Sequence, residues 1–457
     1  MTTRRRGRPR TNLAKSEVGL KTRIEDRSAI IGVVGLGYVG LPLAVEFAEA
    51  GLQTIGVDIS EEKVRSLSAG KNYIQDLDNT RVRELVRSKK TLSATTDWSR
   101  LAECDVIYIC VPTPFTPNKD PDISHIEDAT KRVAATLRKG QLVILKSTTF
   151  PGTTEKYVKP ILDGTGLICG KEYFLAFSPE RIDPGNQVWT TKNTPVVVGG
   201  VTKACLDLAV AVNGIVIANV VPVSTPAVAE MEKLLENIFR SVNIALVNEL
   251  AQLCDRIGVN IWEVVQAAST KPFGFMPFYP GPGIGGHCIL IDPYYLSWMA
   301  REVDFVTNFI TLAAEVNESM PFYVRSMIER EIAKQPVRLK DARILLLGMA
   351  FKKDVDDLRH SPALKVAELM VDDGIENISY YDPYIPHVDV RGRRLESRKS
   401  LTPGFIARHH VVVITTDHSA FDIDFICKHA RVVIDTRNAT RNVKNTRKNI
   451  VLLGEGK

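Results

Sequence analysis

Short apolar segments alternate with segments of helical periodicity along most of the chain. Segments with the length and content of buried strands lie at residues 28–34, 52–58, 105–111, 142–145 and 174–177. Four more lie at residues 343–347, 378–381, 410–414 and 431–434. Strand-like runs that alternate with helical patterns are typical of parallel sheets in α/β proteins. The pattern therefore predicts two α/β domains, one in each half of the chain.

A glycine-rich turn follows the first predicted strand. The run Gly35-Leu36-Gly37-Tyr38-Val39-Gly40 has the GxGxxG spacing, and a helical pattern starts directly after it. The first glycine permits the tight turn, the second lets a pyrophosphate approach, and the third lets helix and strand pack closely. Asp58 ends the next strand, where a carboxylate bonds the adenosine ribose and repels a 2′-phosphate. The spacing predicts NAD rather than NADP; the second α/β domain lacks this motif.

The long helical segment at residues 227–257 would connect the two domains. Its apolar positions recur at helical spacing, as at Met231, Leu234 and Leu235. We therefore predict an α/β fold of two Rossmann-like, doubly wound domains joined by a long central helix. The expected parts are a disordered basic tail at 1–27, a first Rossmann domain at 28–222, a central helical domain at 223–335 and a second α/β domain at 336–457.

Positive charge is concentrated at the N-terminus. Residues 1–23 hold eight Lys or Arg against one acid, a net of +7, whereas all 457 residues sum to +6, so the remainder is −1. A segment with so few apolar residues is expected to be disordered. It contains Arg6-Gly7-Arg8-Pro9, which is similar to the core of a minor-groove AT-hook, so DNA binding stays open beside simple solvated charge.

Seven cysteines, an odd number without CxxC spacing, indicate reduced thiols and a cytoplasmic protein. No run of 18 or more apolar residues occurs, so we expect no membrane segment.

Cys288 is the strongest candidate for covalent chemistry. It ends the run Gly283-Ile284-Gly285-Gly286-His287-Cys288, and Asp292 follows four residues later. Glycines let backbone N–H groups approach a ligand of the sulfur, and a nearby carboxylate can hold a water or direct a proton. The alternative is a structural cysteine after a tight turn, because free cysteine is often buried.

Polar residues follow several predicted strands and line one face of the long helix. Thr113, Thr148 and Glu180 lie just beyond three strands, at the edge where open parallel sheets bind ligands. Lys233 and Asn237 are four residues apart on the helix, so a cation and an amide point the same way. Turn capping and a solvated polar stripe are the alternatives that need no function.

Taken in order, these motifs resemble those of the UDP-glucose/GDP-mannose dehydrogenases, which use NAD to oxidise the C6 alcohol of a nucleotide sugar to a carboxylate. The resemblance covers nearly the whole chain after the tail. It rests on Gly35-Leu36-Gly37-Tyr38-Val39-Gly40-Leu41-Pro42, Val111-Pro112-Thr113-Pro114, Ser147-Thr148, Ser178-Pro179-Glu180-Arg181, Gly285-Gly286-His287-Cys288 with Asp292, and Phe351-Lys352 with Arg359.

The resemblance implies two successive oxidations that use two NAD and no metal. Cys288 would add to the intermediate aldehyde, and water would cleave the resulting thioester. Asp292 would assist proton transfer, Lys233 and Asn237 would stabilise the oxyanion, and Glu180 and Thr148 would place the water. The implied NAD contacts are Gly35, Gly37, Tyr38, Val39, Gly40, Asp58, Lys63, Thr113 and Arg359, and the implied UDP-sugar contacts are Tyr279, Gly283, Gly285 and Lys352.

The resemblance also bears on the sugar. Pro184 stands where glucose-specific animal-type enzymes have a second glutamate, and Lys271-Pro272-Phe273 stands where the N-acetylmannosamine branch tends to carry His-Pro-Arg. Residues 271–283 and 291–296 are most similar to the branch that oxidises UDP-N-acetylglucosamine. We expect that substrate ahead of UDP-glucose and UDP-N-acetylmannosamine, a uronic acid product for surface polysaccharide, and a homodimer or higher homo-oligomer. The arginine that many relatives offer across a dimer interface is not evident near Lys271.

Two other classes stay open. A β-hydroxyacid or phosphogluconate-type dehydrogenase would share the first domain and the long helix, but it would transfer one hydride without a cysteine. A non-catalytic regulator would bind DNA through the tail with salt-sensitive affinity.

Overall fold

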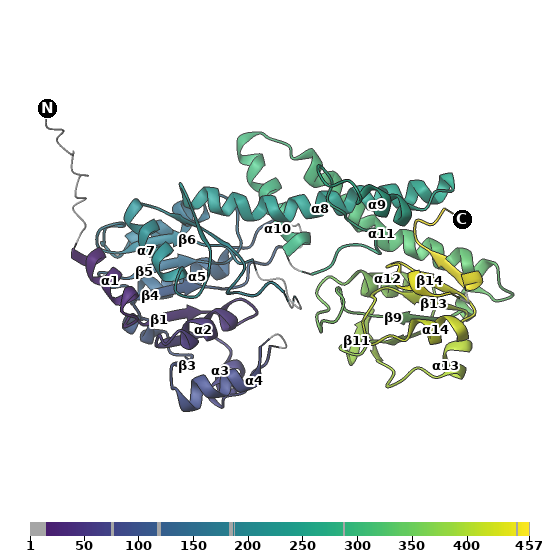
Figure 1. The fold of residues 1–457 in the computed structure, drawn as a ribbon, viewed down its shortest axis with the longest axis horizontal. Coiled ribbons are helices and arrows are strands. Elements are labelled where there is room, and N and C mark those ends of the chain that lie inside the picture. The colour runs from purple at the N-terminus through teal and green to yellow at the C-terminus, as the bar shows by residue number, and fades with distance from the viewer. Residues whose placement is uncertain are drawn as a thin grey trace. The chain divides into compact units, whose positions relative to one another are not determined.

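The computed structural model describes residues 15–74, 77–116, 120–181, 186, 188–286, 288–444 and 447–456. The chain divides into two compact units, Met1–Leu234 and Leu235–Lys457, and each is described by itself (Figure 1). The division falls inside α8 (Pro226–Ile257), a helix of 32 residues that corresponds to the one predicted at 227–257.

The first unit contains an eight-stranded sheet. Its order is β3 (Leu92–Thr95), β2 (Thr54–Val57), β1 (Ile31–Val34), β4 (Val106–Ile109), β5 (Leu142–Leu145), β6 (Phe174–Phe177), β7 (Val196–Gly200) and β8 (Val220–Val223). Neighbouring strands are parallel except β6 and β7. The chain runs outward from β1 to β3 and then returns to β4 on the other side of β1. Open α/β sheets bind ligands at such a reversal.

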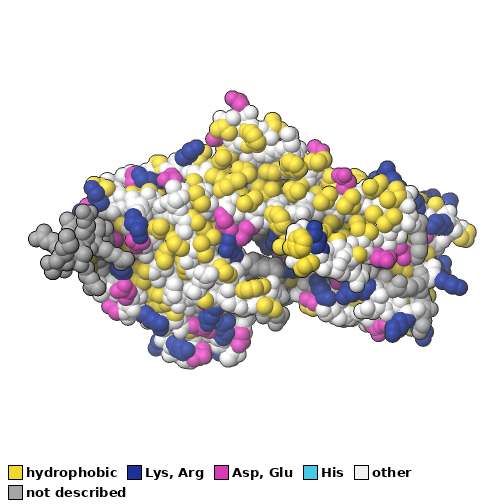
Figure 2. Space-filling view, turned by 45° about the horizontal axis from the view of Figure 1, so that its top comes forward, with side chains coloured by type: hydrophobic (Ala, Val, Ile, Leu, Met, Phe, Trp, Pro, Cys, Tyr) yellow, Lys and Arg dark blue, Asp and Glu magenta, His cyan; other side chains and the backbone are white. Residues whose placement is uncertain are grey.

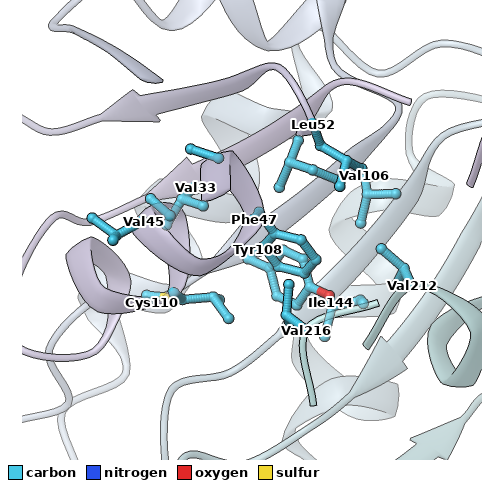
Figure 3. Close-up of a cluster of buried hydrophobic side chains, with 14 of the residues drawn as sticks. Val33, Val45, Phe47, Leu52, Val106, Tyr108, Cys110, Ile144, Val212 and Val216 are labelled. Atoms are coloured by element: carbon cyan, nitrogen blue, oxygen red, sulfur yellow. The ribbon is translucent and has the colours of Figure 1, made fainter. Parts of the chain in front are cut away.

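Helices of the first unit bury both faces of this sheet. They are α2 (Gly40–Glu49), α3 (Glu61–Ser68), α4 (Asn79–Arg83), α5 (Ser124–Ala134), α6 (Lys159–Asp163) and α7 (Lys203–Asn213), with π turns at Glu84–Ser88 and Thr154–Val158 and a 3-10 helix at Trp98–Glu103. Val33 and Tyr108 face the α2 side, where Phe47 packs on Tyr108 at 5.3 Å between ring centroids (Figure 3). Val34 and Ile109 face the α5 side. Burial on both faces explains the uninterrupted apolar strands.

The prediction of disorder for residues 1–27 is wrong for its last part. Residues Lys15–Glu25 form helix α1. Leu20 and Ile24, one turn apart, are 0% and 1% exposed, and they belong to the same core as α7. Arg23 pairs with Asp105 at 3.1 Å. Two apolar residues at helical spacing were enough to dock this basic segment, whereas residues 1–14, with Arg6-Gly7-Arg8-Pro9, lie outside the described residues.

The second unit begins with helices and ends with a second parallel sheet. After α8 come α9 (Ile261–Ala268), α10 (Cys288–Ala300), a 3-10 turn at Arg301–Val303 and α11 (Asn308–Ala333). The five-stranded sheet has the order β10 (Asn377–Tyr381), β9 (Arg343–Leu347), β13 (Val411–Ile414), β14 (Val433–Asp435) and β15 (Ile450–Leu452), all parallel. Its helices are α12 (Pro362–Asp372), α13 (Pro403–Ala407) and α14 (Ile423–His429), with 3-10 turns at Leu339–Asp341, Ala439–Asn442 and Arg447–Asn449. A hairpin of β11 (His387–Val390) and β12 (Arg393–Glu396) completes it.

The structure confirms the predicted fold class, with two Rossmann-like α/β parts and a long central helix. Among the helices of the described ranges, none is long and apolar enough to cross a membrane.

Candidate functional site

The turn after β1 shows why two of its glycines are required. Gly35 has a φ of +88°, and a Cβ there would lie 2.5 Å from the carbonyl oxygen of Cys110. A Cβ on Gly40 would lie 1.8 Å from the carbonyl oxygen of Gly35. At Gly37, by contrast, no heavy atom of the described residues lies within 4 Å of the Cβ position. Packing therefore fixes the first and third glycines, and the second leaves open space above the turn.

The start of α2 is suited to an anion. Its N-cap residue, Val39, provides no side-chain hydrogen bond, and no acidic residue lies in its first turn. Tyr38, just before it, is 42% exposed. Uncapped backbone N–H groups and the helix dipole together favour a phosphate at this position. The turn and the helix start fit the pyrophosphate of a dinucleotide.

Asp58, which follows β2, holds the turn after β1 through a hydrogen bond. Its side chain is 6% exposed, and it accepts hydrogen bonds from the backbone N–H groups of Leu36 and Ser60, each at 2.8 Å. Lys63 Nζ lies 3.3 Å from Asp58 Oδ2. Tyr73, which the sequence did not single out, donates its hydroxyl to the Leu36 carbonyl at 2.8 Å. Burial and the Asp58 charge raise the pKa of Tyr73, so it stays a donor that holds the turn.

Polar residues gather at the carboxyl ends of β4, β5 and β6, as expected. Thr113 is buried, Thr148 is half-buried, and Glu180 follows β6. The structure adds Lys146, a 2% exposed lysine whose Nζ lies 3.3 Å from Glu180 Oε2. Sequence reasoning missed it because its partner is 34 residues away along the chain.

A buried carboxylate on α8 fixes the loop that follows Thr148. Glu230 is fully buried and accepts hydrogen bonds from the backbone N–H groups of Gly152 and Thr154, at 2.5 and 2.9 Å. The Thr154 hydroxyl also donates to it at 2.7 Å. Burial raises the pKa of Glu230, against these hydrogen bonds, which lower it. The contact ties the end of β5 to the helix that carries Lys233.

The polar pair predicted on the long helix is buried rather than solvated. Lys233 and Asn237 are 8% and 2% exposed, so the alternative of a solvated stripe is wrong. Asn237 Nδ2 donates to Asp292 Oδ2 at 2.6 Å, and Asp292 is 1% exposed. Among the described residues, Lys233 makes no hydrogen bond or ion pair. The side chain of Lys233 is thus largely buried while its ammonium has no counter-charge among the described residues, which leaves the charge available to a ligand.

Cys288 is the first residue of α10, and Asp292 lies one turn later on the same helix. The side chain of Cys288 and the whole of His287 lie outside the described residues.

The glycines before Cys288 are explained by packing within the second unit. A Cβ on Gly285 would lie 2.5 Å from Phe351 Cβ, and one on Gly286 would lie 2.9 Å from the Phe351 ring. Gly283, with a φ of +131°, lies against Asn317 and Pro362. The segment is therefore pressed onto the loop after β9, which carries Lys352.

The other predicted ligand residues of the second unit have defined partners. Arg359 makes a two-pronged contact with Asp357, at 3.0 and 2.6 Å. The ring of Tyr279 stacks on Trp262 at 5.8 Å between centroids, and Tyr279 remains 52% exposed. Lys352 is partly buried.

A buried network that the sequence did not reveal holds the loop after β9. Asp382 accepts hydrogen bonds from the backbone N–H groups of Met349 and Ala350, at 2.6 and 3.0 Å. His418 Nε2 lies 3.1 Å from Asp382, while His418 Nδ1 accepts from the Asp354 N–H at 2.9 Å. Burial acts to raise the pKa of Asp382, but the hydrogen bonds from His418 and the backbone outweigh it and lower the pKa. These partners come from three separate strand ends.

The fold and the turn after β1 define a dinucleotide-binding protein. Comparison with known proteins narrows the class. Models of the UDP-glucose/GDP-mannose dehydrogenase family match this chain in three parts: the NAD binding domain at residues 29–215, the central domain at 227–319 and the UDP binding domain at 345–442.

Similar proteins cover nearly the whole chain. It is 37% identical over 413 residues to UDP-N-acetyl-D-mannosamine dehydrogenase of Pyrococcus horikoshii, which is 89% of this chain and 95% of that protein. It is 36% identical over 417 residues to NDP-N-acetyl-D-galactosaminuronic acid dehydrogenase of Ralstonia nicotianae, with 89% and 95% covered. It is 35% identical over 361 residues to UDP-N-acetyl-D-glucosamine 6-dehydrogenase of Pseudomonas aeruginosa, with 79% and 84% covered.

The solved structure of the Pyrococcus horikoshii UDP-D-ManNAc dehydrogenase is similar at a TM-score of 0.84 and 33% identity, covering 93% of this chain and 99% of that one. This chain belongs to the UDP-glucose/GDP-mannose dehydrogenase family. It is an NAD-dependent nucleotide-sugar dehydrogenase with a UDP-binding domain.

Proposed function

We propose that this enzyme oxidises the C6 alcohol of a UDP-N-acetylhexosamine to a carboxylate through a covalent intermediate on Cys288. UDP-N-acetyl-D-glucosamine is the first candidate substrate. The observation that carries the proposal is the buried polar group of α8 and α10. Lys233 is buried with no counter-charge among the residues that the structure describes, and Asn237 is hydrogen-bonded to Asp292, one turn after Cys288.

The residues of that group have complementary roles. Bound NAD accepts the hydride in each oxidation. Cys288 adds to the C6 aldehyde and forms a thiohemiacetal, whose oxygen carries developing negative charge. The Lys233 ammonium and the Asn237 amide are the donors that stabilise this charge. Asp292, oriented by Asn237, exchanges the proton of the thiol. After the second oxidation, Glu180 and Thr148 place the water that cleaves the thioester.

We assign the remaining site residues to NAD or to the UDP-sugar. In the first unit, NAD is held at Gly35, Gly37, Tyr38, Val39 and Gly40, with the adenosine side at Asp58 and Lys63 and with Thr113 at the crevice. Arg359 is assigned to the dinucleotide as well. The UDP-sugar is assigned to Lys352, to Tyr279 and to the backbone of Gly283 and Gly285. The proposed domain limits are 28–222, 223–335 and 336–457, which contain the three matched ranges.

Two sugars are candidates for the substrate, and different observations favour each. The run around Lys271 favours UDP-N-acetylglucosamine, whereas the 37% identity to the UDP-N-acetyl-D-mannosamine dehydrogenase favours the manno epimer. The test is kcat/KM for NADH formation with UDP-N-acetylglucosamine, UDP-N-acetylmannosamine and UDP-glucose. We expect the first sugar to exceed the others by at least tenfold. A higher value with the manno sugar would replace the first candidate, and activity with UDP-glucose alone would overturn the acetamido assignment.

We also propose that the enzyme is a homodimer or a higher homo-oligomer. Helices of the second unit expose apolar side chains that one chain leaves uncovered: Leu246, Leu250, Leu253, Ile257, Val264, Phe309 and Leu312. Figure 2 shows hydrophobic side chains gathered on one face of the molecule. Exposed apolar patches of this kind mark association surfaces. Light scattering should give at least twice the 50.7 kDa of one chain. A monomer at micromolar concentration would contradict this.

The six cysteines whose side chains are described are free thiols. Together with the odd cysteine count they support a reducing compartment, and we propose the cytoplasm.

A further inference from the structure

A buried lysine lies beside Glu180 in the first unit. Lys146 follows β5 directly and is 2% exposed. Within the described part of the chain, its ammonium contacts Glu180 Oε2 and the Pro179 carbonyl oxygen, both at 3.3 Å. Lysine is almost never buried to this extent unless it is paired. Because desolvation offsets most of the attraction, a buried ion pair is a weak source of stability. The Lys146–Glu180 pair is therefore better explained by a role in the reaction than by a contribution to stability.

The register of the sheet places this pair at the ligand-binding edge. Ile109 pairs with Leu145, and Leu145 pairs with Phe177, so Cys110, Lys146 and Ser178 follow three adjacent strands at the same level. Burial raises the pKa of the Cys110 thiol to about 12. Cys110 is therefore neutral, and the Lys146 charge is directed to Glu180.

Glu180 is held through both oxygens. Oε1 accepts a hydrogen bond from the Arg181 N–H at 2.8 Å, and Oε2 faces the Lys146 ammonium. Two restraints fix the plane of the carboxylate. A carboxylate oxygen has two acceptor directions, and Oε2 is itself buried, so Oε1 is the oxygen that can accept a further hydrogen bond from a water.

We propose that Lys146 is a positioning residue for the hydrolytic step, which orients Glu180 and supplies the charge that stabilises its carboxylate. This inference rests on the proposed function, in which Glu180 serves hydrolysis. The water oxygen adds to the acyl carbon, and its proton passes to Glu180. The carbon–sulfur bond then breaks, which leaves a thiolate on Cys288 and a uronic acid product. The step consumes one water and needs no oxidant or reductant.

The test separates hydrolysis from the oxidations in the variant Lys146→Met. After rapid mixing with NAD and UDP-sugar, we expect a burst of two NADH per Cys288, as in the wild type. The steady-state rate that follows should fall about 100-fold, a typical effect of impairing a general base. Intact-mass measurement should then show the acyl adduct on the protein. Lys146→Arg, which keeps the charge, should recover most of the rate.

A matched control and a double variant distinguish positioning from folding. Lys139 is an exposed lysine of the same unit, paired with Glu172 at 2.7 Å, and Lys139→Met should leave burst and steady state unchanged. Lys146→Met leaves the Glu180 carboxylate without its counter-charge and should lower thermal stability. The double variant Lys146→Met/Glu180→Gln removes both charges and should regain thermal stability. That double variant should still accumulate the adduct.

Two results would overturn the role of Lys146: a wild-type steady-state rate in Lys146→Met, or recovery of hydrolysis together with stability in the double variant. A wild-type enzyme that releases one NADH per sugar would instead overturn the proposed function, whatever Lys146 does.

Discussion

The two parallel sheets share the arrangement of their first strands, but only one is shaped for a dinucleotide. In each, the first strand, β1 or β9, lies between the second strand and the strand that returns. In each, an aspartate after the second strand accepts backbone N–H groups of the turn after the first. Asp58 binds Leu36, and Asp382 binds Met349 and Ala350. The bracing aspartate is therefore a common device.

The difference lies in the helix that follows. α2 starts at Gly40 with no side-chain cap, whereas α12 starts at Pro362 and is capped by Ser361, whose hydroxyl accepts from the Ala363 and Leu364 N–H groups. The first helix thus keeps its N–H groups for phosphate, and the second uses them internally. In both sheets the strand order forms the crevice, whereas the sequence of the turn and the start of the next helix determine which ligand the crevice can bind.

The largest effect is expected when a Cβ is added to the turn after β1. Gly40→Ala places that atom 1.8 Å from the Gly35 carbonyl, so the backbone must shift. We expect a loss of about 3 kcal/mol in unfolding free energy, typical of overpacking, together with lost NAD binding. Gly37→Ala is the matched control, since its Cβ meets open space, and should weaken NAD binding without a change in stability. Urea unfolding and NAD titration measure the pair; equal stability losses would contradict the geometry.

The two aspartates that hold these turns can be compared by replacing each with asparagine. Asp382→Asn removes buried charged hydrogen bonds and should cost about 2 kcal/mol, with no change in the NAD dissociation constant. Asp58→Asn should weaken NAD binding and reduce the preference for NAD over NADP by roughly tenfold, since the repelling charge is lost. An unchanged cofactor preference in Asp58→Asn would argue against the ribose contact.

The pH dependence of stability sharpens the same contrast. Because the folded pKa of Asp382 is lowered, its contribution is fully present above the ordinary aspartate pKa and is lost as the pH falls through the lowered value. A folded-state pKa that lies one unit below the unfolded value corresponds to about 1.4 kcal/mol of stability. Unfolding free energies between pH 5 and pH 3 should fall more steeply in the wild type than in Asp382→Asn. Parallel curves would mean that Asp382 does not contribute.

The smallest effect concerns the cap of α12. Ser361→Ala should cost about 1 kcal/mol, and Ser361→Gly only a few tenths through capping, because glycine is itself tolerated at an N-cap. Urea unfolding compares them. A loss in Ser361→Gly that equals that of Ser361→Ala would assign the effect to the Ser361 hydroxyl bond to the Met349 carbonyl, seen at 2.6 Å, rather than to the cap.

The sequence predicted best the strands that are marked by a continuous run of apolar residues. The apolar runs at 142–145, 174–177 and 343–347 coincide with β5, β6 and β9, because strands buried on both faces leave no polar interruption. Helix α1 was missed because Leu20 and Ile24 are a weak signal within a basic segment, and docking decides its structure. β7 and β8 were missed as well: β8 exposes part of its short run, and β7, although buried, ends in two glycines that weaken its strand signal.

The site was predictable where it follows motifs and unpredictable where it depends on distant partners. GxGxxG located the turn, and helical spacing placed Lys233 beside Asn237. Lys146 looked like any polar residue after a strand, and its meaning comes from Glu180 on the next strand. Asp382 and His418 are 36 residues apart and meet only because β10 and β13 flank β9.

In the proposed mechanism, the two oxidations are linked through Cys288. The most direct measurement counts NADH released per UDP-N-acetylhexosamine consumed by purified enzyme, with the product sugar identified by mass. We expect two NADH per sugar and a uronic acid product. One NADH per sugar, with an aldehyde or ketone as the product, would contradict it.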